Sequence, residues 1–281
     1  MKTWSQLFLQ TNLLLALGFA PAFTSAQTLA KVAVLQWSPP PARVGITAAE
    51  AEIIKQANRV TLGNFAIDAA KNGALLVIFP EFSVVGYPDI PELPPEEDEF
   101  RNREEIAPYV ETASGNTFKY FSKIAAENHI AIHVGFAEVD PNDQKYYNGT
   151  LVIDSNGKRL ASYRKINLYQ GENNFLSRGT KPITYKSKFG VVALGTCSDI
   201  YSANLLQTYK ASKTKVFAVG MSWAAHGGPM GSAAHAARTL NAHVLISNND
   251  YFPGTGIFNP DGSTQALTVE QNGLVYGSVP V

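Results

Sequence analysis

Short apolar runs, separated by longer segments with helical spacing, constrain the fold of this chain more than any other feature. Residues 30–36 (AKVAVLQ) and 74–79 (ALLVIF) are rich in aliphatic side chains and end abruptly, as buried strands do. Between them, residues 47–71 place apolar side chains at helical spacing and run into Asn72-Gly73, a common helix end. A strand, a helix and a second strand in this order predict a layered α/β domain.

The same alternation continues along the chain. We expect helices at 118–128 and 231–241, strands at 130–136, 189–194, 216–219 and 244–247, and hairpins at 147–163 and from 256 onward. The turn of the first hairpin contains Asn156-Gly157, a pair that favours tight turns. The predicted strands do not alternate apolar and polar residues. Their sheet is therefore expected to be covered by helices on one face and by a second sheet on the other.

The composition fits one large domain. The chain has 281 residues, 45% of them hydrophobic, which is enough to bury a sizeable core. Lys+Arg and Asp+Glu both total 23, so no net field recruits nucleic acid or an anionic membrane. We therefore expect a small-molecule partner that is recognised locally.

The first 26 residues resemble a secretory signal peptide. Lys2 gives a positive start, residues 13–22 (LLLALGFAPA) form a short apolar stretch, and Thr24-Ser25-Ala26 provides a small-residue cleavage site. The apolar stretch is shorter than the ~20 residues that a membrane-spanning helix needs. We therefore expect cleavage near Ala26, a domain over residues 27–281, a secreted or periplasmic location and no stable membrane anchor.

Three polar residues stand where predicted strands end. Glu81 follows ALLVIFP, Lys165 lies in SYRKINLY and Cys197 follows VVALGT. Each alone has an ordinary structural explanation: an exposed carboxylate, a solvated lysine and a small buried thiol. Together they provide a nucleophile with the base and the cation that a thiol needs for activation.

In this interpretation the three side chains divide the work of amide cleavage. Glu81 accepts the thiol proton of Cys197 and later returns it to the leaving nitrogen. Lys165 and the backbone N–H of Ser198 stabilise the anionic intermediate.

The segments IFPEFSVVGY, YRKINLYQGE and GVVALGTCSD resemble the three blocks of the nitrilase, or carbon–nitrogen hydrolase, superfamily. This resemblance implies a four-layer α-β-β-α sandwich with a Glu81, Lys165 and Cys197 triad, and it assigns a second site carboxylate to Glu172. It also implies a homodimer or higher homo-oligomer. The stretches YNGTLVID and GTGIFNPDG are similar, more weakly, to the biotinidase and pantetheinase branch.

We also expect Tyr87, Tyr169 and Trp223 to line the substrate pocket, Trp223 on the strength of the resemblance. Residues 87–108, rich in Pro and carboxylates, are expected to form a loop at the rim of the site. No cofactor or metal is required, because the five histidines lack a recognised metal spacing and the glycines at 254–256 do not complete a dinucleotide fingerprint.

Two further motifs are weaker. The segment around Ser222 imitates a serine nucleophile elbow, but no acidic residue lies between Ser222 and the last histidine, His243. Asn148-Gly149-Thr150 fits a glycosylation sequon and is interpreted as incidental.

The leading functional hypothesis is hydrolysis of a linear amide through a thioester on Cys197. Nitrile hydrolysis and acyl transfer to an amine remain alternatives within the same chemistry. A secreted binding protein that has lost catalysis is the alternative from another class. The identity of the acyl and amine groups depends on the loops around the site, and the motifs do not specify it.

Overall fold

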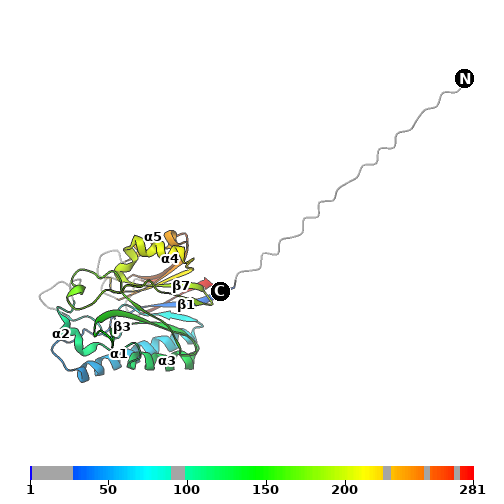
Figure 1. The fold of residues 1–281 in the computed structure, drawn as a ribbon. Helices are drawn as coiled ribbons and strands as arrows, with labels where there is room; N and C mark the ends of the chain where they lie inside the picture. Colours follow the sequence, from blue (N-terminus) through cyan, green and yellow to red (C-terminus); the bar gives the residue numbers. More distant parts are fainter. Residues whose placement is uncertain (2–27, 90–98, 224–228, 250–253, 269–272) are drawn as a thin grey trace.

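The computed structural model describes Met1 and residues 28–89, 99–223, 229–249, 254–268 and 273–281 (Figure 1). Apart from Met1, the expected signal segment lies outside the described residues. The described residues form two six-stranded sheets that lie face to face, together with helices and loops.

The first sheet contains the last strand of the chain, which pairs with the first strand, and the strands of the first half of the chain. Its order is β12 (Gly273–Pro280), β1 (Leu29–Gln36), β2 (Leu76–Ile78), β3 (Ala131–Val139), β4 (Tyr146–Ile153) and β5 (Arg159–Arg164). The pairs β1–β2 and β2–β3 are parallel, and the others are antiparallel. Since β4 and β5 form a hairpin on β3, β5 ends at the same edge of the sheet as β2.

The second sheet repeats this plan. Its order is β11 (Thr264–Thr268), β10 (Thr255–Phe258), β9 (His243–Asn248), β8 (Val216–Met221), β7 (Gly190–Thr196) and β6 (Thr184–Ser187). Here β7, β8 and β9 are parallel, and the flanking strands are antiparallel. The parallel centre brings the carboxyl ends of β7 and β8 together, because Thr196 pairs with Gly220.

Helices cover the outer face of each sheet (Figure 1). The helices α1 (Ala48–Lys71) and α3 (Asn116–Asn128) lie on the first sheet, and α4 (Ala203–Ala211) and α5 (Met230–Leu240) lie on the second. The expected four-layer α-β-β-α sandwich is therefore confirmed. Helix α1 starts at a capping box, in which the Thr47 hydroxyl accepts from the Glu50 N–H and the Glu50 carboxylate accepts from the Thr47 N–H.

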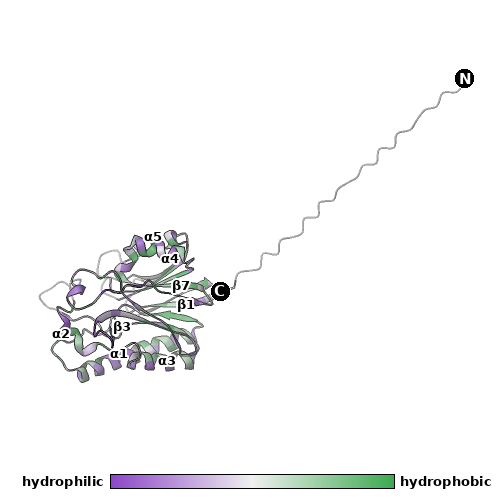
Figure 2. Ribbon diagram, in the orientation of Figure 1, coloured by the Kyte–Doolittle hydropathy of each residue, from purple (hydrophilic) through white to green (hydrophobic). Residues whose placement is uncertain are grey.

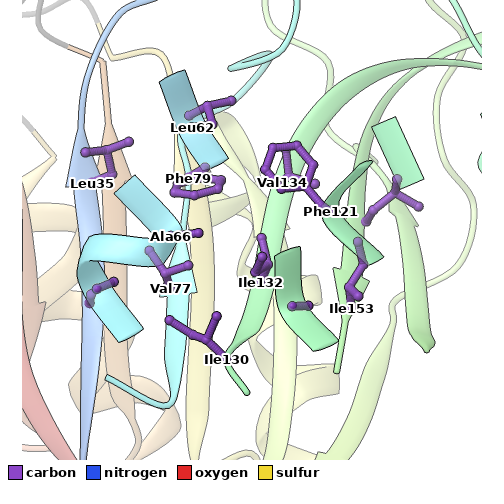
Figure 3. Close-up of a cluster of buried hydrophobic side chains, with 14 of the residues drawn as sticks. Leu35, Leu62, Ala66, Val77, Phe79, Phe121, Ile130, Ile132, Val134 and Ile153 are labelled. Atoms are coloured by element: carbon purple, nitrogen blue, oxygen red, sulfur yellow. The ribbon is translucent and has the colours of Figure 1, made fainter. Parts of the chain in front are cut away.

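Three clusters of apolar side chains fill the spaces between the two helix layers and the two sheets. Leu62 and Phe121 from the helices meet Val77 and Ile132 of the first sheet (Figure 3). A second cluster joins the two sheets and includes Val34, and a third joins the second sheet to α4 and α5. Apolar residues accordingly concentrate on the inner strands, and polar residues on the outward helix faces (Figure 2). Burial on both faces explains why these strands show no alternation.

The structure departs from the predicted elements in four places. Of the hairpins expected from 256 onward, the described residues form only β10–β11, because β12 pairs with β1 in the first sheet. Helix α4 and strand β6 were not predicted, because both are short and only Leu205, Leu206 and Tyr209 of α4 are buried. The loop expected at 87–108 contains helix α2 (Arg103–Ile106) and the start of the 3₁₀ turn η2 (Ala107–Tyr109), so that expectation is wrong for its last part. The Asn102 side chain caps α2 by accepting from the Glu105 N–H. Residues 90–98 lie outside the described residues.

None of the helices in the described ranges combines the length and apolar character needed to cross a membrane.

Candidate active site

The Glu81 backbone lies between the two sheets, just beyond the end of β2. A Cβ added to Gly135 of β3 would lie 2.6 Å from the Pro80 carbonyl oxygen, and one added to Gly220 of β8 would lie 3.1 Å from the Glu81 nitrogen. Real Cβ atoms do not approach backbone atoms as closely as the first of these distances, so Gly135 has to lack a side chain. Phe82 adopts a positive φ of 46°, which turns the chain sharply after Glu81. Both sheets thus fix the position of the Glu81 side chain.

Lys165 joins two buried carboxylates. It directly follows β5, and its ammonium donates to Glu81 Oε1 at 2.8 Å and to Glu172 Oε1 at 2.9 Å. Glu172 opens the 3₁₀ turn η3 (Glu172–Asn174), and its other oxygen accepts from the Tyr169 N–H at 2.6 Å. All three side chains are almost fully buried. Burial lowers the pKa of Lys165, but the Glu81 and Glu172 charges outweigh it and raise that pKa well above its ordinary value, so the ammonium stays charged.

Two neutral donors complete the environment of Glu81. The Asn148 side chain on β4 donates to Glu81 Oε1 at 2.6 Å, and the Ser222 N–H after β8 donates to Glu81 Oε2 at 2.9 Å. Burial raises the pKa of Glu81, while Lys165 and Asn148 lower it. The carboxyl group therefore takes up a proton more readily than an exposed glutamate does.

Cys197 lies at the end of β7, at the first position of the 3₁₀ turn η4 (Cys197–Tyr201). Its φ of 44° is unfavourable for a residue with a side chain, and such strained conformations cluster at functional sites. The residue is half-buried, and its thiol is free. It lies within electrostatic range of Glu81, Lys165 and Glu172. The structure thus brings Cys197 and the three buried charged side chains into one site.

The Cys197 thiol is protonated in this environment. Burial raises its pKa, and the Glu81 charge raises it further, against the opposing effects of Lys165 and the Ser222 N–H. A protonated thiol is a weak nucleophile, so attack on a substrate requires a base at the same site. The Glu81 carboxylate is the neighbouring group that can serve as this base.

Asp199 holds the turn that carries the thiol. This fully buried carboxylate accepts from the Thr196 N–H at 3.0 Å, from the Asn167 N–H at 2.8 Å and from the Tyr163 hydroxyl at 2.7 Å. These bonds connect the end of β7 to β5 and to the segment after Lys165. The Ser198 hydroxyl strengthens the same link by donating to the Asn167 carbonyl. The backbone N–H of Ser198 stays a predicted oxyanion donor, at the position after the thiol.

The expected pocket residues lie around this site at different depths. Tyr87 is buried and packs on Phe82, and its hydroxyl lies within electrostatic range of Glu81, Glu172 and Cys197. Tyr169 is exposed and Trp223 is half-buried. The Trp223 ring packs against Tyr201 at a centroid distance of 5.3 Å.

Tyr201, which the sequence did not single out, lies within electrostatic range of Cys197 and of Tyr169. The ring of Tyr201 is also exposed. We therefore interpret the three rings of Tyr169, Tyr201 and Trp223 as the outer rim of the site.

A fourth carboxylate, Glu99, borders the site. Its Oε2 atom packs against Gly171, where an added Cβ would lie 2.5 Å away, next to Glu172 in sequence. Burial, followed by the Glu172 charge, raises the pKa of Glu99 to about 8. Phe100, the following residue, anchors this carboxylate by packing on Tyr109 and Phe175.

Asn148 and Ser222 belong to this site. Asn148 is 1% exposed, so the folded protein does not present its sequon for glycosylation. Ser222 contributes its backbone N–H to Glu81, and its hydroxyl oxygen accepts from the Asn249 side chain, an amide donor that cannot act as a base. The position of Ser222 after β8 could have been anticipated, because carboxyl ends of adjacent parallel strands meet at one edge. Nothing local in the sequence marks Glu99 or Tyr201.

Buried His133 is hydrogen-bonded to a tyrosine. His133 Nε2 lies 2.6 Å from the Tyr185 hydroxyl, and burial lowers the pKa of His133 to about 3. His226 lies outside the described residues. Within the described ranges, no set of three or more His, Cys, Asp or Glu side chains is arranged to hold a metal ion.

Comparisons with known proteins identify the family and the fold. The profile of the family described as Carbon-nitrogen hydrolase matches residues 31–279. Human pantetheinase is 25% identical over 240 residues, which cover 76% of this chain and 46% of the pantetheinase. The chain therefore spans about half the length of that relative.

Two solved structures share the fold. Saccharomyces cerevisiae Nit3, a member of branch 10 of the nitrilase superfamily, matches with a TM-score of 0.72 at 19% identity over 90% of both chains. An amidase from Nesterenkonia sp. matches with a TM-score of 0.70 at 18% identity over 89% of this chain and 90% of the amidase.

Proposed function

Because the chain belongs to the carbon-nitrogen hydrolase family, we propose that it is an amidase that cleaves a linear amide through a thioester on Cys197. The observation that carries this proposal is the Lys165 ammonium, buried between the Glu81 and Glu172 carboxylates beside a strained, half-buried cysteine. Membership of the family makes the protein a carbon–nitrogen hydrolase. The substrate class and the role of each side chain are the proposed part.

The first half of the reaction forms the thioester. Glu81 removes the Cys197 proton as the sulfur attacks the amide carbon, and the carbonyl π electrons move onto oxygen. The Lys165 ammonium and the Ser198 N–H stabilise this oxyanion. When the intermediate collapses, the carbon–nitrogen bond breaks, and Glu81 passes its proton to the leaving nitrogen.

The second half releases the acid. Glu81, again ionised, takes a proton from a water molecule while the water oxygen attacks the thioester carbon. Collapse of the second tetrahedral intermediate breaks the carbon–sulfur bond and expels the thiolate, which recovers the proton from Glu81. The bond from Lys165 keeps Glu81 in place during these two proton transfers.

A relative has a reactive cysteine in its active site. A Glu-to-Gln variant of the Nesterenkonia amidase shows covalent addition of the acetamide moiety of fluoroacetamide at its active site cysteine. This adduct keeps the acetamide group, so it supports a nucleophilic cysteine and not the thioester itself. In this chain the nucleophile is proposed to be Cys197.

The test is mass spectrometry of the Cys197 peptide after incubation with a panel of short linear amides. We expect acyl adducts in the wild type and none in E81Q, since the thiol of this variant has lost the base that takes its proton. Cys197→Ala should fold, as judged by thermal unfolding, but should form no adduct and no product. Unreduced amide turnover by this variant would refute the proposal.

The products separate the alternative reactions. Release of ammonia or an amine together with the acid identifies amide hydrolysis, and conversion of the corresponding nitrile identifies a nitrilase. An amide formed with an added amine identifies acyl transfer. A protein that binds the whole panel without any adduct or product would fit the non-catalytic binding protein.

Location and assembly are proposed from the sequence. We propose export with cleavage near Ala26, which would leave β1 intact because this strand begins at Leu29. We also propose association into a homodimer or a higher homo-oligomer, which light scattering of the purified protein tests.

A further inference from the structure

Asn148 contacts both carboxylates of the site with a neutral side chain. Its Nδ2 atom donates to Glu81 Oε1 at 2.6 Å and lies 3.3 Å from Glu172 Oε1. The side chain is 1% exposed. Two carboxylate oxygens face this end of the amide, so it must be the NH₂ end. Both hydrogens of that group are therefore directed at the site.

Asn148 bridges the same two oxygen atoms as Lys165. The Lys165 ammonium donates to Glu81 Oε1 and to Glu172 Oε1. The Asn148 amide nitrogen contacts the same two atoms, so the two donors and two acceptors form a closed ring of hydrogen bonds. One ammonium faces two carboxylates here, which leaves an excess of negative charge on side chains that are almost fully buried. Neutral N–H donors stabilise this excess without adding a titratable group.

The backbone of Asn148 completes the arrangement. Its carbonyl oxygen accepts from the Lys165 N–H at 2.9 Å, at the point where β5 leaves the sheet. The Asn148 Oδ1 atom is buried without a hydrogen-bond partner. An unpaired buried oxygen is costly, so an asparagine at this position has a stability penalty that its N–H donors must offset.

We propose that Asn148 is a positioning residue that acts through Glu81: its amide holds the Glu81 carboxylate ionised and oriented to accept the thiol proton. This inference rests on the proposed function, in which Glu81 is the base. Loss of the amide donors should therefore make Glu81 harder to ionise, because the ionised form loses a charge-assisted hydrogen bond.

Several other groups act on Glu81 and must stay constant in the test. The titratable groups around it are Lys165 after β5, Glu172 in η3, the Cys197 thiol in η4, Tyr87 and Glu99. A substitution at position 148 that is isosteric and neutral changes none of these charges. Asn148→Leu meets both conditions.

We expect N148L to raise the pKa of Glu81 by about 1–2, the size expected for one lost charge-assisted hydrogen bond. The direct readout is carboxyl ¹³C NMR of glutamate-labelled protein, with the Glu81 resonance assigned by its loss in E81Q. The acidic limb of kcat/KM should move to higher pH by the same amount. At a fixed pH below this limb, kcat/KM should then be about 10-fold to 100-fold lower than in the wild type.

Asn148→Ser is a second variant that keeps one donor, and its Glu81 titration should lie between those of the wild type and N148L. Asn167→Ala is the matched control. It removes an amide bond of 2.8 Å to another buried carboxylate, Asp199, without touching Glu81. We expect N167A to change thermal stability but to leave the Glu81 titration in place.

The outcomes separate this inference from the proposed function. If the wild type forms no acyl adduct, the amidase proposal fails, whereas the NMR titration still tests the link between Asn148 and Glu81. If hydrolysis is intact but Glu81 titrates at the same pH in folded N148L or N148S as in the wild type, the role of Asn148 is refuted.

Discussion

Lys165 balances two buried carboxylates that would otherwise repel each other. Removing one member of a buried ion pair costs about 3–5 kcal/mol, because the remaining charge is left uncompensated. We therefore expect Lys165→Met to lose about this much unfolding free energy at neutral pH as well as its activity. Urea denaturation measures the first effect and amide turnover the second.

The pH dependence of K165M distinguishes lost charge balance from lost packing. Without the ammonium, burial and the Glu172 charge raise the pKa of Glu81 further above that of an unfolded glutamate, about 4.3. Stability is then retained at low pH and decreases as pH rises through the raised pKa. K165M should thus be more stable at pH 5 than at pH 8. The control is Lys123→Met, which removes an exposed ion pair with Glu127. Its unfolding free energy should equal that of the wild type at pH 5 and at pH 8.

Glu99 makes the stability of the wild type depend on pH. Its folded-state pKa of about 8 lies above its unfolded value, so the folded state holds this proton over the interval between them. The stabilisation is complete below the unfolded pKa and is lost as pH rises through about 8. We expect Glu99→Gln to reduce the decline of unfolding free energy between pH 5 and pH 8. Equal slopes for the two proteins would contradict this assignment.

At the scale of elements, strands β3 and β8 hold the turn that carries Glu81. A methyl group on Gly135 would collide with backbone atoms on either side of Glu81, at 2.6 Å from the Pro80 oxygen and 2.7 Å from the Phe82 nitrogen. We expect Gly135→Ala to displace this turn and to cost about 1–3 kcal/mol from overpacking. The loss of turnover should be larger than the loss of stability alone explains, since displacements of ~1 Å can reduce rates ~100-fold.

Helix α5 offers the control for this prediction. A Cβ on Gly231 meets no atom within 4 Å. Gly231→Ala should therefore be neutral or slightly stabilising, as expected for alanine in place of glycine in a helix. A G135A protein with wild-type kcat would show that the close approach at β3 does not position Glu81.

Elements with a strong pattern could be predicted from the sequence, and short elements could not. The apolar runs at β1, β3 and β8 and the helical spacing of α1 are long enough to identify both type and place. Helix α4 buries only three side chains, so its pattern is weak. The capped helix α2 begins within a segment whose prolines and carboxylates indicate a loop.

The residues of the site also differ in how well the sequence predicts them. Glu81, Lys165 and Cys197 lie at or just after the ends of strands, so the strand pattern identifies them as candidates. Asn148 lies in the middle of β4, and Glu99 reaches the site through the packing of Phe100. Their proximity depends on register and on tertiary contacts that no local sequence signal encodes.

At the scale of the whole molecule, the two ends of the described domain complete one sheet. All eight residues of β12 pair with β1, from Leu29 with Pro280 to Gln36 with Gly273. Val275 and Val279 also enter the layer between the sheets. We expect a chain truncated after residue 272 to expose β1 as an unpaired apolar edge and to aggregate. Removal of Val281 alone should leave cooperative thermal unfolding intact.

Processing of the precursor provides a second test at this scale. Cleavage after Ala26 would place the new amino terminus two residues before β1, and the Thr28 carbonyl would still pair with the Val281 N–H at 3.0 Å. We expect the exported protein to begin at Gln27 by mass spectrometry. A product that starts within residues 30–36 would contradict this, because it would lack part of a central strand.

The glycines on either side of Glu81 couple the evolution of the core to that of catalysis. Gly135 belongs to one sheet and Gly220 to the other, so the thickness of the layer between the sheets determines where the base stands. Substitutions that thicken or thin this layer should therefore reduce turnover before they compromise folding.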